Sequence, residues 1–394
     1  MGNCDGGNEV WGKMEVPMEE KKKIMLIVPM LHQGGFERVC VATARLLEPY
    51  YDVFILIFDS KDIAYDIKGL NVIDLHMGVR DSKIGKAVNI VKRSRAVRKW
   101  KRRLNIDIAY SFGPSANIVN VFSGRQAKIW VGIRSYMDME NQGKIRLFCR
   151  RADKVLCCSA RIEEEVREKY GCGKAVTLYN PLDVADLREK ASGEEPLLPW
   201  DNRENIIASM GREDDVKGFW HLIKAFSLVR REIPDAKLLL IGEGEFEEYR
   251  VLAEELQVGD GVCFTGLKRN PFPYLGAAQL YVLTSYHEGF PNALIEAMAL
   301  GVPVIATDCL TGPREILQGE NESYGILIGN MSPEKNLQAD VITEEERLLA
   351  EEMKHMLGEE PYRETYCRAA VKRAGDFSDG YYTERLREWA EEAR

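Results

Sequence analysis

Short apolar runs alternate with longer amphipathic stretches along most of the chain. The apolar runs cover residues 24–28, 53–58, 72–75, 108–112, 129–133, 155–158 and 176–179 in the first half, and residues 206–209, 237–241, 262–265, 280–284, 304–306 and 325–328 in the second. Helical patterns fall between most of them, for example at 36–47 and 160–170. Short buried strands that alternate with helices predict an α/β chain with parallel sheets covered on both faces.

Residues 185–204 interrupt this alternation. They contain turn and linker signals, namely Ser192-Gly193, Pro196, Pro199 and Asp201-Asn202. We therefore expect two Rossmann-like, doubly wound domains, of residues 21–184 and 205–379, joined by a linker of residues 185–204. We expect a disordered tail at residues 1–20, and a C-terminal helix at 380–394 that packs back on the N-terminal domain. Because ligands bind at the carboxyl ends of such strands, the two domains would face a central cleft.

The composition is that of an ordinary globular protein, but the charge is unevenly distributed. Of the 394 residues, 45% are hydrophobic and 29% are charged. No apolar run approaches the roughly 18–20 residues that span a bilayer. The nine cysteines include no CxxC pair, so we expect reduced thiols and a cytoplasmic location. Residues 1–184 carry 31 Lys and Arg against 22 Asp and Glu, a net charge of +9, whereas residues 185–394 carry 23 against 40, a net charge of −17. The basic half is expected to meet an anionic partner.

The segment from Gly211 to Gly218 follows a predicted strand and precedes an amphipathic helix. Its Arg212 and Lys217 are therefore expected on the loop at the carboxyl end of the sheet. An arginine fork and a lysine point charge suit a diphosphate. Taken alone, the pair is more typical of two solvated surface charges.

A second segment follows the predicted strand at 280–284 and leads into a helix that is expected to begin near Pro291 or Asn292. Glu288 then lies on the loop and Glu296 about one turn into the helix. Both carboxylates can face one ligand, and they accept hydrogen bonds of the kind that sugar hydroxyls donate. The free amides at the helix start can also hold an anion. A lone pair of glutamates at this spacing would more often be two unrelated surface residues.

Taken together, the two segments resemble retaining glycosyltransferases of the GT-B fold, in the large group called family 4. The resemblance covers both domains and is most specific in residues 205–328. The N-terminal glycine loop of the family corresponds to Gly34-Gly35-Phe36-Glu37-Arg38, and its diphosphate motif to Gly211-Arg212…Lys217-Gly218. The E-x7-E motif corresponds to Glu288…Glu296. A fourth segment is similar to members that build bacterial surface polysaccharides, namely Thr307-Asp308-Cys309…Gly312-Pro313-Arg314-Glu315-Ile316-Leu317. The spacer Glu213-Asp214-Asp215 is more acidic than is usual in this family.

The resemblance implies a role for each motif. Arg212 and Lys217 would bind the donor pyrophosphate. Glu288 would contact hydroxyls of the transferred sugar, and Glu296 would hold the ribose. With Arg212, Lys217 and Glu288 as catalytic residues, the other donor-site residues implied are Gly34, Gly35, Gly211, His287, Gly289, Phe290, Pro291, Asn292 and Leu294. No metal and no cofactor is implied, because the nucleotide sugar, with UDP as the expected nucleotide, is itself a substrate.

Residues 80–103 form a basic stretch in which Asp81 is the only acid. On a helix, one stripe would hold Ile90, Val97, Trp100 and Leu104, and the opposite face would hold Arg95, Arg98, Lys99 and Arg102. Ile84 and Val88 do not continue the stripe, which allows a break near residue 90. The basic face would contact anionic lipid headgroups or a lipid-linked pyrophosphate. A solvated helix face is the alternative, and nucleic acid is disfavoured because no nucleic-acid motif accompanies the charges.

The resemblance thus implies a retaining, metal-independent hexosyltransferase. It would move a hexose or N-acetylhexosamine from a UDP sugar to a polyprenyl-diphosphate-linked glycan or a polysaccharide, at the inner face of the membrane. Two other functions stay open. A nucleotide-sugar 2-epimerase shares the architecture and would turn over the donor with no acceptor. A non-catalytic, membrane-associated subunit would bind the sugar nucleotide and never transfer it.

Overall fold

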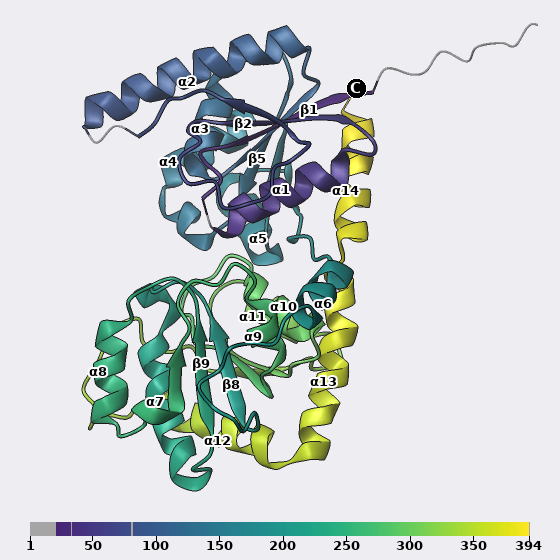
Figure 1. The fold of residues 1–394 in the computed structure, drawn as a ribbon. Helices are drawn as coiled ribbons and strands as arrows, with labels where there is room; N and C mark the ends of the chain where they lie inside the picture. The colour runs from purple at the N-terminus through teal and green to yellow at the C-terminus, as the bar shows by residue number, and fades with distance from the viewer. Residues whose placement is uncertain (1–20, 33, 80–81, 394) are drawn as a thin grey trace, which may run out of the picture.

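The protein folds into two α/β domains, each built around one parallel sheet (Figure 1). The structure is a computed structural model, which describes residues 21–32, 34–79 and 82–393. The predicted tail of residues 1–20 lies outside these residues. Both sheets follow the order 3-2-1-4-5-6 when their strands are numbered within the domain, and the first sheet adds a seventh strand. This order is that of the doubly wound nucleotide-binding folds.

The N-terminal sheet is parallel throughout, in the order β3-β2-β1-β4-β5-β6-β7. Its strands are β1 (Lys23–Val28), β2 (Asp52–Ile57), β3 (Asn71–Asp74), β4 (Ile108–Phe112), β5 (Lys128–Ile133), β6 (Lys154–Cys157) and β7 (Ala175–Thr177). Its helices are α1 (Gly35–Leu47), α2 (Lys83–Leu104), α3 (Pro114–Phe122), α4 (Gln142–Arg151) and α5 (Ala160–Tyr170), with a 3-10 turn η1 (Tyr136–Glu140). The central strand β4 is buried at every position, as helices on both faces require.

The C-terminal sheet repeats this plan with six parallel strands, in the order β10-β9-β8-β11-β12-β13. Its strands are β8 (Ile206–Met210), β9 (Lys237–Ile241), β10 (Val262–Phe264), β11 (Leu280–Leu283), β12 (Val304–Thr307) and β13 (Ile326–Ile328). Its helices are α7 (Phe219–Glu232), α8 (Glu247–Glu255), α9 (Phe272–Gly276), α10 (Asn292–Ala299), α11 (Pro313–Leu317) and α12 (Glu344–Gly358), with 3-10 turns η2 (Asp215–Lys217) and η3 (Gly259–Gly261).

The segment between the domains differs from its prediction as a linker. Residues 184–192 form a helix, α6 (Val184–Ser192), whose start is capped by the Asp183 side chain. Leu187 is buried in the apolar core, and the Arg188 guanidinium donates a hydrogen bond to the carbonyl of Ala299 at 3.1 Å. The first part of the segment 185–204 is therefore helical, which its turn signals did not predict. Gly193, Pro196, Pro199 and Asp201-Asn202 lie in the irregular residues 193–205 that come after α6, and Ser192 is the last residue of that helix.

The last two helices run along one side of both domains (Figure 1). Helix α13 (Glu360–Ala374) packs against α10 in the C-terminal domain. After the 3-10 turn η4 (Gly375–Phe377), α14 (Asp379–Glu392) lies on the N-terminal domain, where Tyr382, Leu386 and Trp389 enter its apolar core. The Tyr382 hydroxyl lies 2.7 Å from the hydroxyl of Thr43 in α1. The chain therefore crosses between the domains a second time.

Helix α2 is one continuous helix of 22 residues, so the break considered near residue 90 is absent. Ser82 caps its start by accepting a hydrogen bond from the amide of Gly85, and the helix contains no proline. Its buried face is largely polar: Lys101 is buried and donates to Asn120 Oδ1 at 2.8 Å. Burial lowers the pKa of Lys101 to about 7. Part of the predicted apolar stripe, Val97, Trp100 and Leu104, packs against the core beside these polar groups. A helix can thus bury polar groups next to an apolar stripe, provided that those groups find partners.

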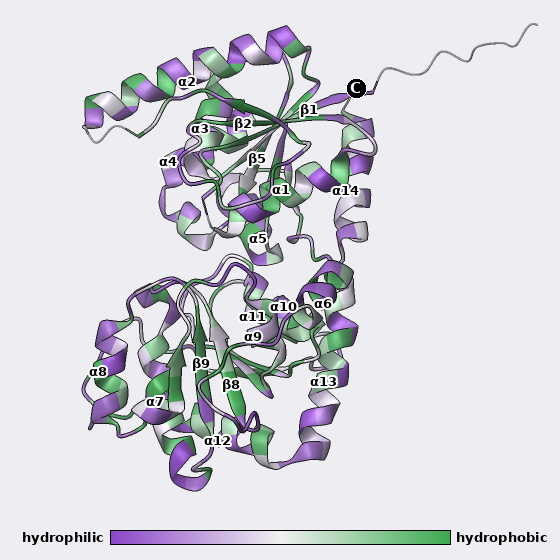
Figure 2. Cartoon of the chain, in the orientation of Figure 1, coloured by the Kyte–Doolittle hydropathy of each residue, from purple (hydrophilic) through white to green (hydrophobic). Residues whose placement is uncertain are grey.

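One apolar cluster extends through both domains. It includes Ile133 and Phe148 from the N-terminal domain and Leu283 and Phe290 from the C-terminal domain. Figure 2 shows the hydrophobic strands in the interior of each domain. Because burial of apolar surface stabilises contacts between layers, the two domains pack against each other at one side of their interface.

Candidate functional site

The carboxyl ends of the two sheets face each other across the domain interface. The strand order reverses between β1 and β4 in one sheet and between β8 and β11 in the other. Ligands of such folds bind beside this reversal point. The loops at these strand ends meet, since Arg38 of α1 forms an ion pair with Glu296 of α10. We call the region between these facing loops the crevice.

The loop between β8 and α7 brings Lys217 back over the end of its own strand. A Cβ added at Gly211 would lie 3.1 Å from Lys217 Cε, so the absence of a side chain at this position makes room for the lysine. The loop turns at Gly218, which has φ +60° and approaches the carbonyl of Thr284 so closely that a Cβ would lie 2.5 Å from it. The Thr284 hydroxyl donates to the carbonyl of Lys217 at 2.9 Å. Lys217 is therefore fixed by contacts at the ends of both central strands, β8 and β11.

Lys217 and Glu288 lie together in the crevice, as the motif spacing predicts. Lys217 Nζ donates to Glu288 Oε1 at 2.7 Å, and both side chains are largely buried. The loop that carries Glu288 is tied to the next loop, because the Thr311 hydroxyl donates to the Glu288 carbonyl. The pair joins a cation from one loop to a carboxylate, a hydrogen-bond acceptor, from another.

Arg212 extends from the same loop and is 71% exposed. Its guanidinium pairs with Asp214 at 3.2 Å, so the acidic spacer holds it at the loop surface. Its charge also acts across the crevice on the Glu37 carboxyl of α1: burial raises the pKa of that carboxyl, and Arg212 lowers it in part. Arg212 thus lies at the mouth of the crevice and Lys217 lies deeper.

Glu296 is buried in the first turns of α10, with 3% of its surface exposed. Its partner is Arg38 from the other domain. Burial raises the pKa of the nearby Tyr281 hydroxyl, and the charges of Glu288 and Glu296 raise it further. The carboxylates of Glu288 and Glu296 therefore both lie near β11. Their spacing in the sequence was compatible with this arrangement but did not require it.

The loop from residue 287 to residue 292 contacts the N-terminal domain along its length. The ring of His287 stacks on Tyr136 with centroids 6.2 Å apart and planes 9° apart. A Cβ at Gly289 would lie 2.5 Å from the carbonyl oxygen of Arg134. Only glycine allows this approach of the two backbones.

The start of α10 is fixed by both domains. Pro291 stands at the N-cap with no side-chain cap, and Asn292 Oδ1 accepts from Asn180 Nδ2 at 2.7 Å. The Phe290 ring lies 5.1 Å from that of Tyr179. Leu294 is fully buried in the apolar core, so its side chain supports α10 from within the domain.

Across the crevice, Gly34 and Gly35 form the start of α1. The Tyr65 hydroxyl holds the Gly34 residue, donating to its carbonyl at 2.7 Å and accepting from its amide at 2.9 Å. A Cβ at Gly35 would lie 3.8 Å from Asn292 Nδ2, so the starts of α1 and α10 are neighbours. Neither helix start has a side-chain cap, and α7 begins in the same way. Uncapped amides at helix starts favour an anion.

Several residues of the crevice were not singled out by sequence reasoning. Arg38 and Glu37 belong to the glycine loop motif, and their position in the first turn of α1 was the available signal. Arg134, Tyr136 and Asn180 follow strands of the N-terminal sheet or precede its helices, and no local pattern marks them. They contact the other domain through pairings that only the tertiary structure creates.

The basic face of α2 lies at a distance from these contacts, at the edge of the N-terminal domain in the view of Figure 1. Arg95, Arg98, Lys99 and Arg102 are exposed. Arg98 also donates to the carbonyl of Ser123 at 2.9 Å, which ties α2 to the end of α3. Within the described part of the chain, no helix has the length and apolar character to cross a membrane. The described residues also contain no cluster of three or more His, Cys, Asp or Glu side chains that could hold a metal ion.

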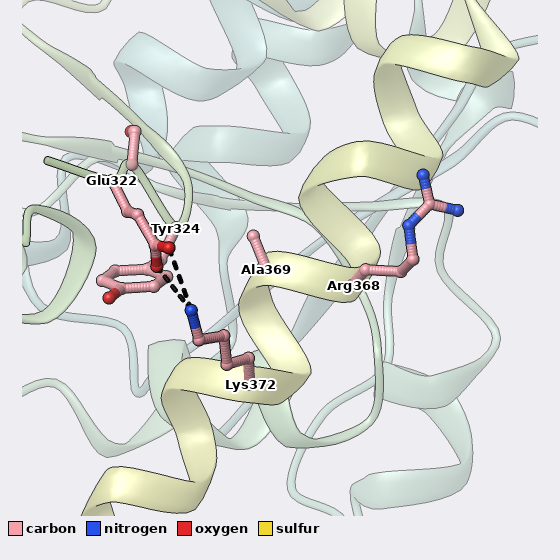
Figure 3. Close-up of a pocket in the computed structure, with 6 residues that line it drawn as sticks. Glu322, Tyr324, Arg368, Ala369 and Lys372 are labelled. Carbon is pink, nitrogen blue, oxygen red and sulfur yellow. Dashed lines mark hydrogen bonds and ion pairs between the residues drawn. The ribbon is translucent and has the colours of Figure 1, made fainter.

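A separate hollow lies on the C-terminal domain, between α13 and the loop before β13 (Figure 3). Lys372 and Glu322 line it and pair with each other at 2.7 Å. None of the crevice residues lines this hollow. We therefore assign the candidate site to the crevice.

Two protein families match the chain, one for each domain. The family described as Glycosyltransferase Family 4 matches residues 33–186, and the family described as Glycosyl transferases group 1 matches residues 194–360. The boundary between the two matches falls in α6, where the chain passes from the first domain to the second.

Several relatives are named as glycosyltransferases. An uncharacterized glycosyltransferase from Methanocaldococcus jannaschii is 37% identical over 187 residues, which cover 44% of this chain and 46% of the relative, so the match spans about half of each protein. An N-acetylgalactosaminyltransferase from Campylobacter jejuni, named for a diphospho-undecaprenol-linked saccharide, is 25% identical over 373 residues, or 90% of this chain and 96% of the relative.

Solved structures share the architecture of both domains. HepE from Anabaena, in complex with UDP and glucose, has a TM-score of 0.73 at 17% identity and covers 94% of this chain and 100% of its own. A sucrose-phosphate synthase from Thermosynechococcus elongatus has a TM-score of 0.73 at 20% identity, with 94% and 99% covered. At such identities the likeness shows the fold alone, which is the GT-B fold.

Proposed function

Because the chain belongs to the family 4, group 1 glycosyltransferases, we propose that it transfers a hexose or N-acetylhexosamine from a nucleotide sugar to a lipid-linked glycan or a polysaccharide. The observation that supports this proposal best is the pair Lys217–Glu288 between the two sheets. Its two groups suit the two halves of a sugar diphosphate: the cation suits the phosphate and the carboxylate suits the sugar hydroxyls.

The donor is a nucleoside diphosphate sugar, with UDP as the proposed nucleotide. In this scheme Arg212 and Lys217 bind the pyrophosphate, together with the uncapped amides at the starts of α1 and α10. Glu296 holds the ribose, after the donor has displaced Arg38 from it. The complex of HepE with UDP and glucose supports a donor of this class.

The chemistry follows from the charge that develops on the leaving diphosphate. The bond between the anomeric carbon and the phosphate oxygen breaks, the acceptor oxygen bonds to that carbon, and its proton leaves. Fixed cations and amides that are aimed at the leaving group lower the barrier, by roughly 3–4 kcal/mol for a single donor group in other enzymes. We propose that this stabilisation needs no metal and that the reaction retains the configuration at the anomeric carbon.

The acceptor is proposed to be a glycan linked to a polyprenyl diphosphate. Two Campylobacter jejuni relatives that are matched over 90% and 93% of this chain carry names of that acceptor class. The exposed Arg95, Lys99 and Arg102 on α2 are the proposed contacts with anionic lipid or with the acceptor's diphosphate. A peripheral position at the inner face of the membrane follows from this proposal.

A screen of nucleotide sugars tests the donor class. Ligands that bind the folded protein raise its melting temperature, so UDP sugars should raise it more than sugars linked to other nucleotides. The best donor is then incubated with lipid-linked acceptors, and transfer is measured with and without the acceptor. Release of a 2-epimer in the absence of acceptor would favour the epimerase, whereas binding with no turnover would favour the non-catalytic subunit.

The variant Glu288→Gln tests the site itself. It keeps the size of the side chain and removes its charge, so we expect transfer to collapse while the variant stays folded. The matched control is Glu164→Gln, which changes an exposed carboxylate on α5 that pairs with Arg161 and should leave transfer unchanged. Unchanged transfer in Glu288→Gln would contradict the role proposed for this residue.

A further inference from the structure

Glu37 is a buried carboxyl group in the crevice that has no part in the proposed transfer so far. It stands in the first turn of α1, two residues after Gly35, and only 8% of its surface is exposed. Its carboxylate folds back under the glycine loop, where a Cβ at Gly34 would clash with Glu37 Oε2. That oxygen is buried and has no hydrogen-bond partner among the described residues. A buried polar atom with no partner costs free energy unless a ligand provides one.

Arg38, Lys217 and Arg212 do not neutralise Glu37, because each of them already has a carboxylate partner. Three ion pairs occupy them: Arg38–Glu296, Lys217–Glu288 and Arg212–Asp214. The guanidinium of Arg134 lies instead against the rings of Tyr110 and Phe112. Glu37 is thus a fourth carboxylate beside three paired cations. A diphosphate that binds at the uncapped starts of α1 and α10 adds negative charge next to it. Two neighbouring anions in a buried site repel each other strongly.

The groups that face Glu37 come from both domains. His32 precedes the glycine loop, Arg212 approaches from the loop after β8, and Cys40 lies one turn further along α1. Burial raises the pKa of Glu37 to about 7, while its backbone hydrogen bond and the charges of His32 and Arg212 lower it only in part. Burial also raises the pKa of Cys40, and that of Tyr65 beside Gly34, so neither group loses its proton near neutrality.

We propose that Glu37 binds the donor diphosphate as a neutral carboxylic acid, which donates a hydrogen bond to a phosphate oxygen, so that donor binding takes up one proton from solvent at Glu37. This inference rests on the proposed function, because it takes a nucleoside diphosphate as the ligand of the crevice. The proton adds to the carboxylate before or as the diphosphate binds, and no covalent bond to the ligand forms. The neutral acid removes the repulsion and gives the unpartnered oxygen its hydrogen bond.

The wild-type protein alone provides the first test, with UDP as the probe in isothermal titration calorimetry. Only the protonated form binds well, so the affinity should fall about eightfold between pH 7.5 and pH 8.5. At pH 7, titrations in two buffers of different ionisation enthalpy should show an uptake of about half a proton per UDP. An affinity that is constant over this pH range, with no proton uptake, would overturn the proposal.

The variant Glu37→Gln provides the second test, since an amide can donate to phosphate at every pH. Its UDP affinity should be constant from pH 7.5 to pH 8.5, and it should exceed that of the wild type at the higher pH. His32→Gln is the control for the other titratable group nearby, and it should keep the wild-type dependence on pH. A wild-type dependence that persists in Glu37→Gln and disappears in His32→Gln would overturn the proposal.

Failure of the proposed function gives a different result. If neither UDP nor ADP, GDP, CDP or dTDP binds the wild-type protein at any pH, the nucleotide-sugar assignment itself fails, and the inference fails with it. If UDP binds equally well to both proteins at every pH, the donor assignment stands and only the role of Glu37 is refuted.

Discussion

The two domains share one strand order, and they differ in the loops at the ends of their central strands. In the C-terminal domain, the loops after β8 and β11 carry a partly buried ion pair, Lys217–Glu288, with the exposed Arg212 at their edge. In the N-terminal domain, the loop after β1 leads into Gly34 and Gly35 at the start of α1, and the buried carboxyl of Glu37 lies two residues further on. The C-terminal loops thus present a paired lysine and carboxylate to the crevice, whereas the N-terminal domain presents an uncapped helix start with Glu37 and Arg38 in its first turn.

This difference teaches that the sheets fix where a ligand can bind, whereas the loops decide which part of it each domain holds. The C-terminal loops suit a phosphate and a sugar. The N-terminal glycine loop suits an anion that approaches the uncapped start of a helix. Variants on the two sides of the crevice, and on the outer surface of the N-terminal domain, can test this division.

Loss of the Lys217 cation should have the largest effect. Lys217→Met removes the charge from the C-terminal side of the crevice, and we expect kcat to fall about 10²–10³-fold, as for other single groups that stabilise a leaving anion. Steady-state transfer assays with saturating donor measure it. Lys372→Met, which removes an exposed lysine from the hollow of Figure 3, should leave kcat unchanged. Equal decreases in kcat for Lys217→Met and Lys372→Met would contradict the role assigned to the C-terminal side of the crevice.

The exposed basic face of α2 extends the comparison to the outer surface of the N-terminal domain. Replacing Arg95, Lys99 and Arg102 by Gln removes three cations, each worth about 1 kcal/mol at an anionic surface, so binding to anionic vesicles should weaken about a hundredfold at low salt. Vesicle flotation at two salt concentrations measures it. A matched triple variant of exposed cations elsewhere changes Lys190, Arg203 and Arg368 to Gln and should retain binding. If the wild type binds neutral vesicles equally well, the lipid proposal fails.

Gly289 tests whether the two loops must meet. A valine there would clash with the backbone at Arg134, where even a Cβ comes within 2.5 Å of the carbonyl oxygen. The domains would have to separate, and we expect about a hundredfold loss in kcat/KM, since displacements near 1 Å at a reacting centre have that cost. Gly329→Val is the control in the same domain, because no atom lies within 4 Å of its added Cβ. A Gly289→Val enzyme with normal kcat/KM would show that this contact is dispensable.

The smallest expected effect is that of Glu37 on the stability of the protein in the absence of ligand. Its pKa of about 7 in the folded protein is above the usual value of 4.5, so the folded state binds more protons than the unfolded state between these values. Its stabilising contribution is complete below pH 4.5 and is lost as the pH rises through 7. The melting temperature of Glu37→Gln relative to the wild type should therefore increase from pH 5 to pH 8. A difference that stays constant over this range would contradict the buried, neutral carboxyl.

Much of the fold and part of the site could be predicted from local pattern. The thirteen strands of the described residues match the predicted apolar runs, and the helix after Glu288 begins at Asn292, near where proline and asparagine predicted it. The meeting of Lys217 and Glu288 was also predictable, because adjacent parallel strands bring the loops at their ends to one edge. Helix α6 was not predicted because it is short and the turn and linker signals come at its end and directly after it. The buried polar face of α2 was missed because its partner, Asn120, lies in another helix.

The sequence by itself determined the alternation of strands and helices, and therefore which loops reach the crevice, since both depend on interactions between residues that are close along the chain. The tertiary structure alone decided which groups those loops meet. Arg38 pairs with Glu296, which is 258 positions away in the sequence, and Gly289 contacts the backbone of Arg134 in the other domain. The raised pKa of Glu37 likewise comes from desolvation by the surrounding fold, and burial by distant segments leaves no periodic signal in a sequence.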